Sequence, residues 1–143
     1  MCEMPSEADI DRLFRAAKAA RSVAYAPYSG FKVGAAVLSE DGSVFAGCNV
    51  ENAAYPQGAC AEAGAICAMA LSGQRRIRAA LVLGEGEALT TPCGGCRQKL
   101  REFAAPDATI LIAGPQGLRA RFTLEALLPA SFGPDNLAPR GGR

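Results

Sequence analysis

The sequence contains no histidine. This absence removes the commonest general base and the commonest nitrogen ligand of zinc, so catalysis or metal binding has to depend on cysteine, glutamate or aspartate. A strong net charge is also missing, because 15 lysines and arginines face 14 aspartates and glutamates and leave a formal charge of +1. Binding of nucleic acid needs a positive field that neutralises phosphates, so no polyanionic partner is expected.

Long apolar runs are missing too. No run approaches the roughly 20 residues that a membrane helix needs, and the first residues lack the charged-then-apolar pattern of a secretory signal. We therefore expect a cytoplasmic protein with no membrane partner. Half of the 143 residues are hydrophobic, which is enough for one compact domain over residues 1–143, with a loosely ordered tail from about residue 134.

The apolar pattern predicts helices that alternate with strands. An amphipathic helix is expected from Ser6 to about Ala24, with Ser6 and Asp9 forming a capping box. Strands at 31–39 and 44–50 flank Asp41-Gly42, a strong hairpin signal. The other predicted elements are helices at 59–71 and 95–103 and strands at 79–83, 109–113 and 119–123. This order predicts an α/β fold, a three-layer α/β/α sandwich with a mixed sheet of about five strands.

The six cysteines are more consistent with metal binding than with disulfides, because disulfide frameworks are typical of small secreted domains without a core. Cys93-Gly94-Gly95-Cys96 follows Pro92 at the start of a predicted helix, where the glycines let both sulfurs approach one ion. The C-x-x-C spacing alone leaves three alternatives open: a zinc site, a thioredoxin-like redox site and inert packing.

Cys60 is the candidate for a third ligand because it opens the other predicted helix, and helix N-termini carry unpaired N–H groups that stabilise thiolates. Three thiolates leave the fourth position on zinc for water, as in catalytic rather than structural sites. Glu62 is the candidate base. Residues two apart in a helix point to nearly opposite sides, so Glu62 reaches the metal only if Cys60 lies at the helix boundary. The alternative is an exposed glutamate favoured by the helix dipole.

Cys60-Ala61-Glu62, followed by Pro92-Cys93-Gly94-Gly95-Cys96-Arg97-Gln98, resembles the signature of the cytidine deaminase family in its form with three cysteines and no histidine. The segments 26–36, 47–55 and 127–132 resemble the same family in order and spacing, so nearly the whole chain is covered. The resemblance implies a homotetrameric enzyme that deaminates cytidine and deoxycytidine, with Zn²⁺ held by the three cysteines and protons moved by Glu62.

The resemblance also implies a nucleoside pocket. In it the side chains of Asn49 and Glu51 bind the ribose hydroxyls, and Phe31 and Ala61 also contact the substrate. Phe132 is implied to stack on the pyrimidine in the site of a neighbouring subunit, so that active sites are shared. Without the resemblance, the two phenylalanines would be interpreted as ordinary core or interface residues.

One position departs from the family pattern. Ala63 stands where an arginine usually follows the catalytic glutamate. Backbone N–H groups at both helix starts, with Arg97 or Gln98, are therefore expected to offset the charge of the thiolates. Of the other cysteines, Cys67 is predicted to be a buried small hydrophobe, while Cys2 and Cys48 have no partner pattern.

Three other functions are each consistent with part of the sequence. A deaminase of a related pyrimidine such as blasticidin S would share the zinc motif, but Asn49-Val50-Glu51-Asn52 matches the ribose-binding pattern and favours cytidine and deoxycytidine. A polynucleotide-editing deaminase is disfavoured because no basic or aromatic strand-binding surface is evident. A structural zinc module would need a fourth ligand, and the sequence offers no obvious one.

Overall fold

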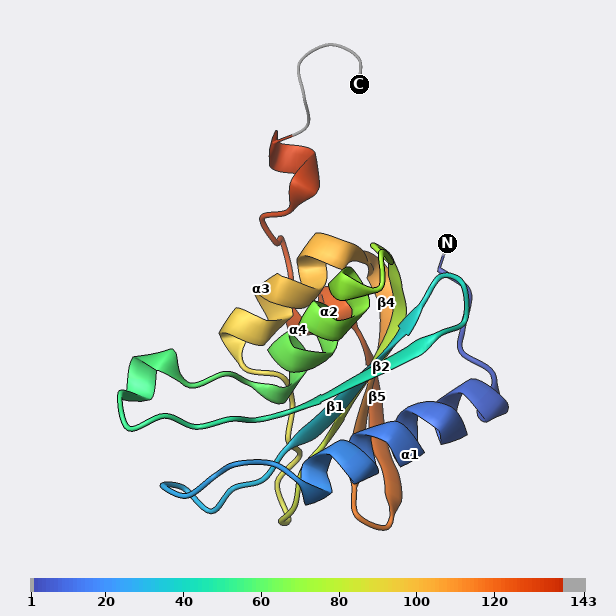
Figure 1. Cartoon of the computed structure of the whole chain (residues 1–143). Helices are drawn as coiled ribbons and strands as arrows, with labels where there is room; N and C mark the ends of the chain where they lie inside the picture. The colour runs from blue at the N-terminus through green and yellow to red at the C-terminus, as the bar shows by residue number, and fades with distance from the viewer. Residues whose placement is uncertain (1, 138–143) are drawn as a thin grey trace.

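The computed structural model describes residues 2–137, which form a five-stranded sheet with helices on both faces (Figure 1). The strand order is β2-β1-β3-β4-β5, and only the β3–β4 pair is parallel. The mixed sheet of the predicted α/β fold is thereby confirmed. The strands are β1 (Gly34–Ser39), β2 (Val44–Cys48), β3 (Ile77–Leu83), β4 (Ala104–Gly114) and β5 (Gly117–Thr123).

The helices complete the three layers. In Figure 1, α1 lies against one face of the sheet, and α2 and α3 lie side by side over the other face. None of the described helices is both long and apolar enough to cross a membrane. The helices are α1 (Glu7–Ser22), α2 (Ala61–Leu71), α3 (Gly94–Phe103) and the single turn α4 (Leu124–Leu127), with 3-10 turns at Tyr55–Gln57 and Pro134–Leu137.

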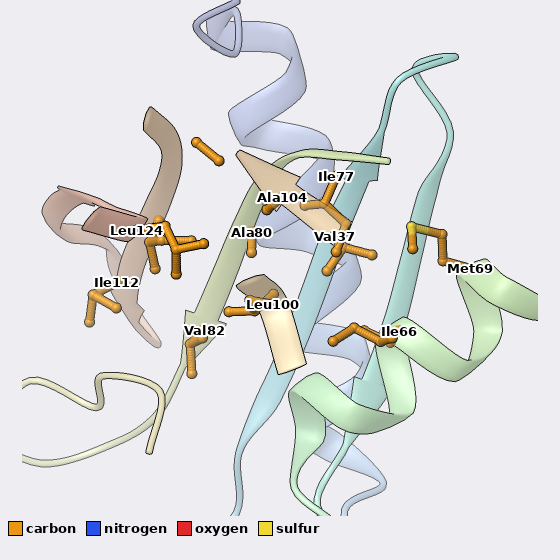
Figure 2. Close-up of a cluster of buried hydrophobic side chains, with 13 residues drawn as sticks. Val37, Ile66, Met69, Ile77, Ala80, Val82, Leu100, Ala104, Ile112 and Leu124 are labelled. Atoms are coloured by element: carbon orange, nitrogen blue, oxygen red, sulfur yellow. The ribbon is translucent and has the colours of Figure 1, made fainter. Parts of the chain in front are cut away.

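Two apolar cores form because side chains alternate across each strand. In β1, Ala36 and Leu38 face α1, whereas Val37 faces α2 and α3. Figure 2 shows the core between the sheet and helices α2 and α3, where Ile66 of α2 and Leu100 of α3 lie over the sheet. In the core on the opposite face, α1 contributes the buried residues Ile10, Leu13 and Ala17.

Local signals predicted the first helix and the hairpin well. Ser6 is the N-cap of α1, and Ser6 and Asp9 form both hydrogen bonds of a capping box. Strand β1 begins at Gly34, three residues later than predicted, because the N–H of Val33 bonds the Oδ1 atom of Asn49 instead of a neighbouring strand.

One other prediction differs from the structure. Cys67 is exposed rather than buried, because the inward face of α2 is occupied by Ala65, Ile66 and Met69. In the predicted tail, Pro134–Leu137 form a 3-10 turn, and residues 138–143 lie outside the described part of the chain.

A glycine on β2 sets the position of α2. A Cβ atom at Gly47 would lie 2.4 Å from both the carbonyl oxygen of Ala61 and the amide nitrogen of Ala65. The first turn of α2 therefore rests directly on the backbone of β2, with no side chain between them. This contact fixes where the helix begins, and Cys60 and Glu62 lie at that end of it.

Candidate active site

Three cysteine side chains converge where α2 and α3 begin. Cys60 is the N-cap of α2, Cys93 is the N-cap of α3, and Cys96 lies in the first turn of α3. Their Sγ atoms all lie within 4.8 Å of one another, and those of Cys60 and Cys93 are 3.9 Å apart. Tetrahedral zinc with Zn–S bonds of about 2.3 Å puts two sulfurs about 3.8 Å apart, so the cluster has the size of a zinc site.

The donor set also fits zinc. Within residues 2–137, one group of at least three Cys, His, Asp or Glu side chains lies close enough together to hold one ion, and it consists of these three cysteines. Thiolates are soft ligands that suit zinc, and three of them leave one coordination position open. An open position is typical of catalytic zinc, whereas a structural module is closed by a fourth protein ligand.

Glu62 faces the sulfur cluster. Cys60 has extended backbone angles, φ −76° and ψ 156°, and so lies just outside the helix, which is the condition under which Glu62 reaches the same centre. Glu62 is only 5% exposed, so the alternative of an exposed glutamate at the helix start is wrong. Its negative charge disfavours ionisation of all three thiols, although other causes outweigh it at Cys93 and lower the pKa of that thiol.

The thiols differ in their electrostatic surroundings. Burial raises the pKa of Cys60, and burial followed by the charge of Glu62 raises that of Cys96. The pKa of Cys93 is lowered instead, first by a hydrogen bond from the backbone N–H of Cys96. A helix-start amide thus stabilises a thiolate at this site, as the sequence predicted.

Arg97 and Gln98, which were expected to help offset the thiolate charge, donate their side-chain hydrogen bonds to other groups. The Arg97 guanidinium donates to the carbonyl oxygens of Pro92 and Leu127, both at 2.7 Å, and to the hydroxyl of Thr91. The side-chain amide of Gln98 donates to the carbonyl oxygen of Phe132 at 2.9 Å. Both side chains therefore hold neighbouring loops by bonding backbone carbonyl groups there.

The predicted sugar-binding residues lie next to the cysteines. Val50 pairs with Ala59 through two backbone hydrogen bonds of 2.9 Å. Asn49 and Glu51 are the neighbours of Val50 in the chain, and Ala59 directly precedes Cys60, so this pairing brings the two segments together. Ala61, the first residue of α2, is buried. Phe31 is 46% exposed, and its carbonyl oxygen accepts a 2.8 Å hydrogen bond from the Nδ2 atom of Asn49.

A cavity of about 300 Å³ opens beside Glu51. Tyr28 and Tyr55 contribute to its wall, with their ring centroids 5.7 Å apart. The Glu51 carboxylate accepts hydrogen bonds from the N–H groups of Tyr28 and Ser29, at 2.9 and 3.1 Å, and from the Ser29 hydroxyl. The remaining residues of the wall are Asn52 and Gly58.

Phe132 lies apart from this cavity wall, on the segment that follows α4. It is 57% exposed, and its backbone is held by α3 through Gln98. The Nε atom of Arg101 donates to the hydroxyl of the adjacent Ser131 at 3.0 Å. The phenylalanine is therefore presented to solvent on an anchored backbone rather than packed into either core.

The family described as the cytidine and deoxycytidylate deaminase zinc-binding region matches residues 7–112 of the chain. The protein belongs to this deaminase family. A cytidine deaminase of Sporosarcina psychrophila is 38% identical over 130 residues, which cover 91% of this chain and 96% of that protein. A cytidine deaminase of Mycobacterium tuberculosis (strain H37Rv) is 48% identical over 121 residues, covering 84% and 86% of the two chains.

Solved structures of the deaminase family agree with the fold. A crystal structure of cytidine deaminase from Burkholderia pseudomallei has a TM-score of 0.79 and 44% identity, covering 85% of this chain and 98% of that one. The crystal structure of cytidine deaminase from Mycobacterium tuberculosis has a TM-score of 0.72 and 41% identity, covering 86% and 96%.

The sequence predictions did not assign a role to three residues of the cavity wall beside Glu51, namely Tyr28, Ser29 and Tyr55. Tyr28 and Ser29 stand in the segment whose resemblance to the family was noted, three and two residues before Phe31. Their arrangement depends on Gly30, whose φ of 69° turns the chain back on itself. That turn brings Ser29 under the backbone of Phe31, which no residue pattern indicates by itself.

Proposed function

We propose that the protein is a zinc-dependent cytidine deaminase, which hydrolyses cytidine and deoxycytidine to uridine and deoxyuridine with release of ammonia. The observation that carries the proposal is the convergence of three cysteine sulfurs at two helix starts with a buried glutamate facing them. The names of the relatives support the choice of substrate, since several proteins at 38–48% identity are cytidine deaminases.

The proposed ligands are Cys60, Cys93 and Cys96. When bound, Zn²⁺ supplies a Lewis acid that lowers the pKa of a water molecule to near neutrality. Glu62 accepts the proton as the water oxygen adds to C4 of the cytosine ring, and it then delivers protons to the ring nitrogen N3 and to the departing amine. Water and cytidine are consumed, and uridine and ammonia leave. The burial of Glu62 supports this role, because it keeps the carboxylate away from bulk solvent.

The sugar is proposed to bind between Asn49 and Glu51. The Nδ2 atom of Asn49 uses one hydrogen on Phe31 and keeps a second for a ribose hydroxyl. Of the roughly four lone-pair sites of the Glu51 carboxylate, the three loop donors leave one free for a ribose hydroxyl. Phe31 and Ala61 are proposed to contact the nucleoside from the neighbouring loop and the helix start. Hydrogen-bond donors and acceptors placed opposite the sugar hydroxyls can recognise an uncharged sugar without an ion pair.

A homotetramer with shared sites is the proposed assembly, with Phe132 stacking on the pyrimidine of a neighbouring subunit. The exposure of Phe132 and its anchored backbone support this role. The outward side of α2 also supports an interface, because Leu71 is 91% exposed and Cys67 is exposed beside it on an apolar helix.

We further propose that the reaction serves pyrimidine salvage in the cytoplasm. The supporting observation is that none of the six cysteines is in a disulfide, and cysteines stay reduced in the cytosol.

A turnover assay across cytidine, deoxycytidine, cytosine and blasticidin S tests the proposed function. The zinc-loaded protein should release ammonia from both nucleosides and from neither of the other two compounds. Free cytosine lacks the sugar that Asn49 and Glu51 are proposed to hold, so it should bind poorly. Turnover of blasticidin S without turnover of either nucleoside would contradict the substrate assignment while leaving the zinc chemistry intact.

A further inference from the structure

The hydroxyl group of Ser29 lies between two residues of the proposed nucleoside pocket. It donates to the Oε2 atom of Glu51, and its oxygen accepts the N–H of Phe31 at 3.0 Å. One short side chain therefore links the carboxylate proposed to bind the sugar to the backbone of the phenylalanine beside it.

The loop that carries Phe31 depends on such side-chain links. Within the described part of the chain, every hydrogen bond between residues 28–31 and residues 49–51 involves the side chain of Glu51 or Asn49. Backbone hydrogen bonds to residues 49–51 form only before and after this loop. Tyr25 bonds Asn49 and Glu51 before it, and Val33 bonds Asn49 after it. The conformation of Phe31 is therefore set by side chains rather than by a strand ladder.

A backbone turn at Gly30 brings Ser29 and Phe31 close enough to form this link. Its φ of 69° lies in the left-handed region that glycine adopts at little cost, and the N–H of Gly30 bonds the carbonyl oxygen of Ala26 at 2.9 Å. The chain turns at this point, so the N–H of Phe31 points back to the Ser29 hydroxyl. The hydroxyl is thus the contact between the two ends of a three-residue turn.

The link is strong for a surface contact because one partner is charged. A hydrogen bond from a hydroxyl to a carboxylate is roughly twice as strong as one between neutral groups. The Ser29 hydroxyl is also the leading cause that lowers the pKa of Glu51. A free glutamate side chain samples several rotamers, and fixing it before the substrate arrives removes that entropy cost from binding.

We propose that Ser29 is a positioning residue of the nucleoside pocket, whose hydroxyl holds the Glu51 carboxylate and the Phe31 backbone in the arrangement that receives the sugar. It acts through those two residues and does not touch the reacting atoms. This inference rests on the proposed function, because the pocket is defined by the nucleoside substrate. It predicts an effect on binding rather than on the chemical step.

The test compares zinc-loaded Ser29→Ala, Ser29→Thr and a matched control, Ser72→Ala. Ser72 donates its hydroxyl to the carbonyl oxygen of Met69 at the opposite end of α2. Ser29→Ala should raise the KM for cytidine about tenfold, as expected for one charged hydrogen bond, with kcat within about twofold of the starting protein. Ser29→Thr keeps a hydroxyl at an exposed position and should restore the low KM. The control should change neither constant.

A second readout does not depend on turnover. Amide hydrogen exchange at Phe31 should be faster in Ser29→Ala than in the starting protein and in Ser72→Ala, because the acceptor of that N–H is gone. If the starting protein is inactive on every nucleoside, the proposed function fails, and faster exchange still supports the link. If the starting protein is active but Ser29→Ala keeps its KM, or loses only kcat, the positioning role is overturned.

Discussion

Replacing Glu62 with glutamine tests the proton chemistry of the site. The substitution nearly preserves the shape of a side chain on a residue only 5% exposed, so the packing around α2 should survive. The carboxamide cannot accept the proton of the attacking water. Positioned acid–base groups contribute about 10²- to 10⁴-fold, and one residue here serves several transfers, so kcat should fall at least about 100-fold. That loss corresponds to about 2.7 kcal/mol of transition-state stabilisation.

Zinc should remain bound in Glu62→Gln. The negative charge of Glu62 opposes ionisation of Cys60, Cys93 and Cys96, so a neutral glutamine removes repulsion from the thiolate cluster. The assay follows the conversion of cytidine to uridine by absorbance, with zinc measured on the same sample. Glu7→Gln is the matched control, because Glu7 also lies in the first turn of a helix, on the far face of the sheet. Near-normal turnover with zinc bound would refute the mechanism, and loss of zinc would show that Glu62 is a ligand.

Two further predictions concern packing and assembly. Gly47→Ala should destabilise the fold by about 1–3 kcal/mol and lower activity, because its methyl group would lie 2.4 Å from the backbone of α2. Thermal unfolding measures this change. Activity should fall together with the assembled fraction on dilution, as followed by sedimentation, and Phe132→Ala should lower turnover in the assembled protein. An unchanged Tm in Gly47→Ala would contradict the close packing of α2 on β2, and a fully active monomer would contradict the shared site.

Features governed by short-range rules could be predicted from the sequence. The capping box of α1 and the Asp41-Gly42 hairpin depend on residues that are neighbours in the chain. The convergence of Cys93 and Cys96 follows from a spacing of three at a helix start, and Cys60 was added because it opens the other predicted helix. Sequence spacing left the direction of Glu62 open, because it depends on the extended backbone angles of Cys60 at the helix boundary.

The features that the sequence did not predict depend on contacts between distant residues. Arg97 and Gln98 have partners 30 and 34 positions away, which no local pattern specifies. Cys67 is exposed because the sheet selects which side of α2 faces inward, and α2 is apolar on all sides. The contacts of Ser29 could not be predicted, because they form only when residues 29, 31 and 51 meet in space.

The most direct test of the central claim is the zinc content of the purified protein, grown with ample zinc. Three sulfurs already gathered at two helix starts should bind about one zinc per chain. Cys93→Ala should lose the metal and part of the stability with it. Cys67→Ala is the matched control and should keep its zinc, because that thiol is exposed on α2 and is not one of the three grouped sulfurs. Full deaminase activity with far less than one zinc per chain, or normal zinc content in Cys93→Ala, would contradict the three-cysteine site.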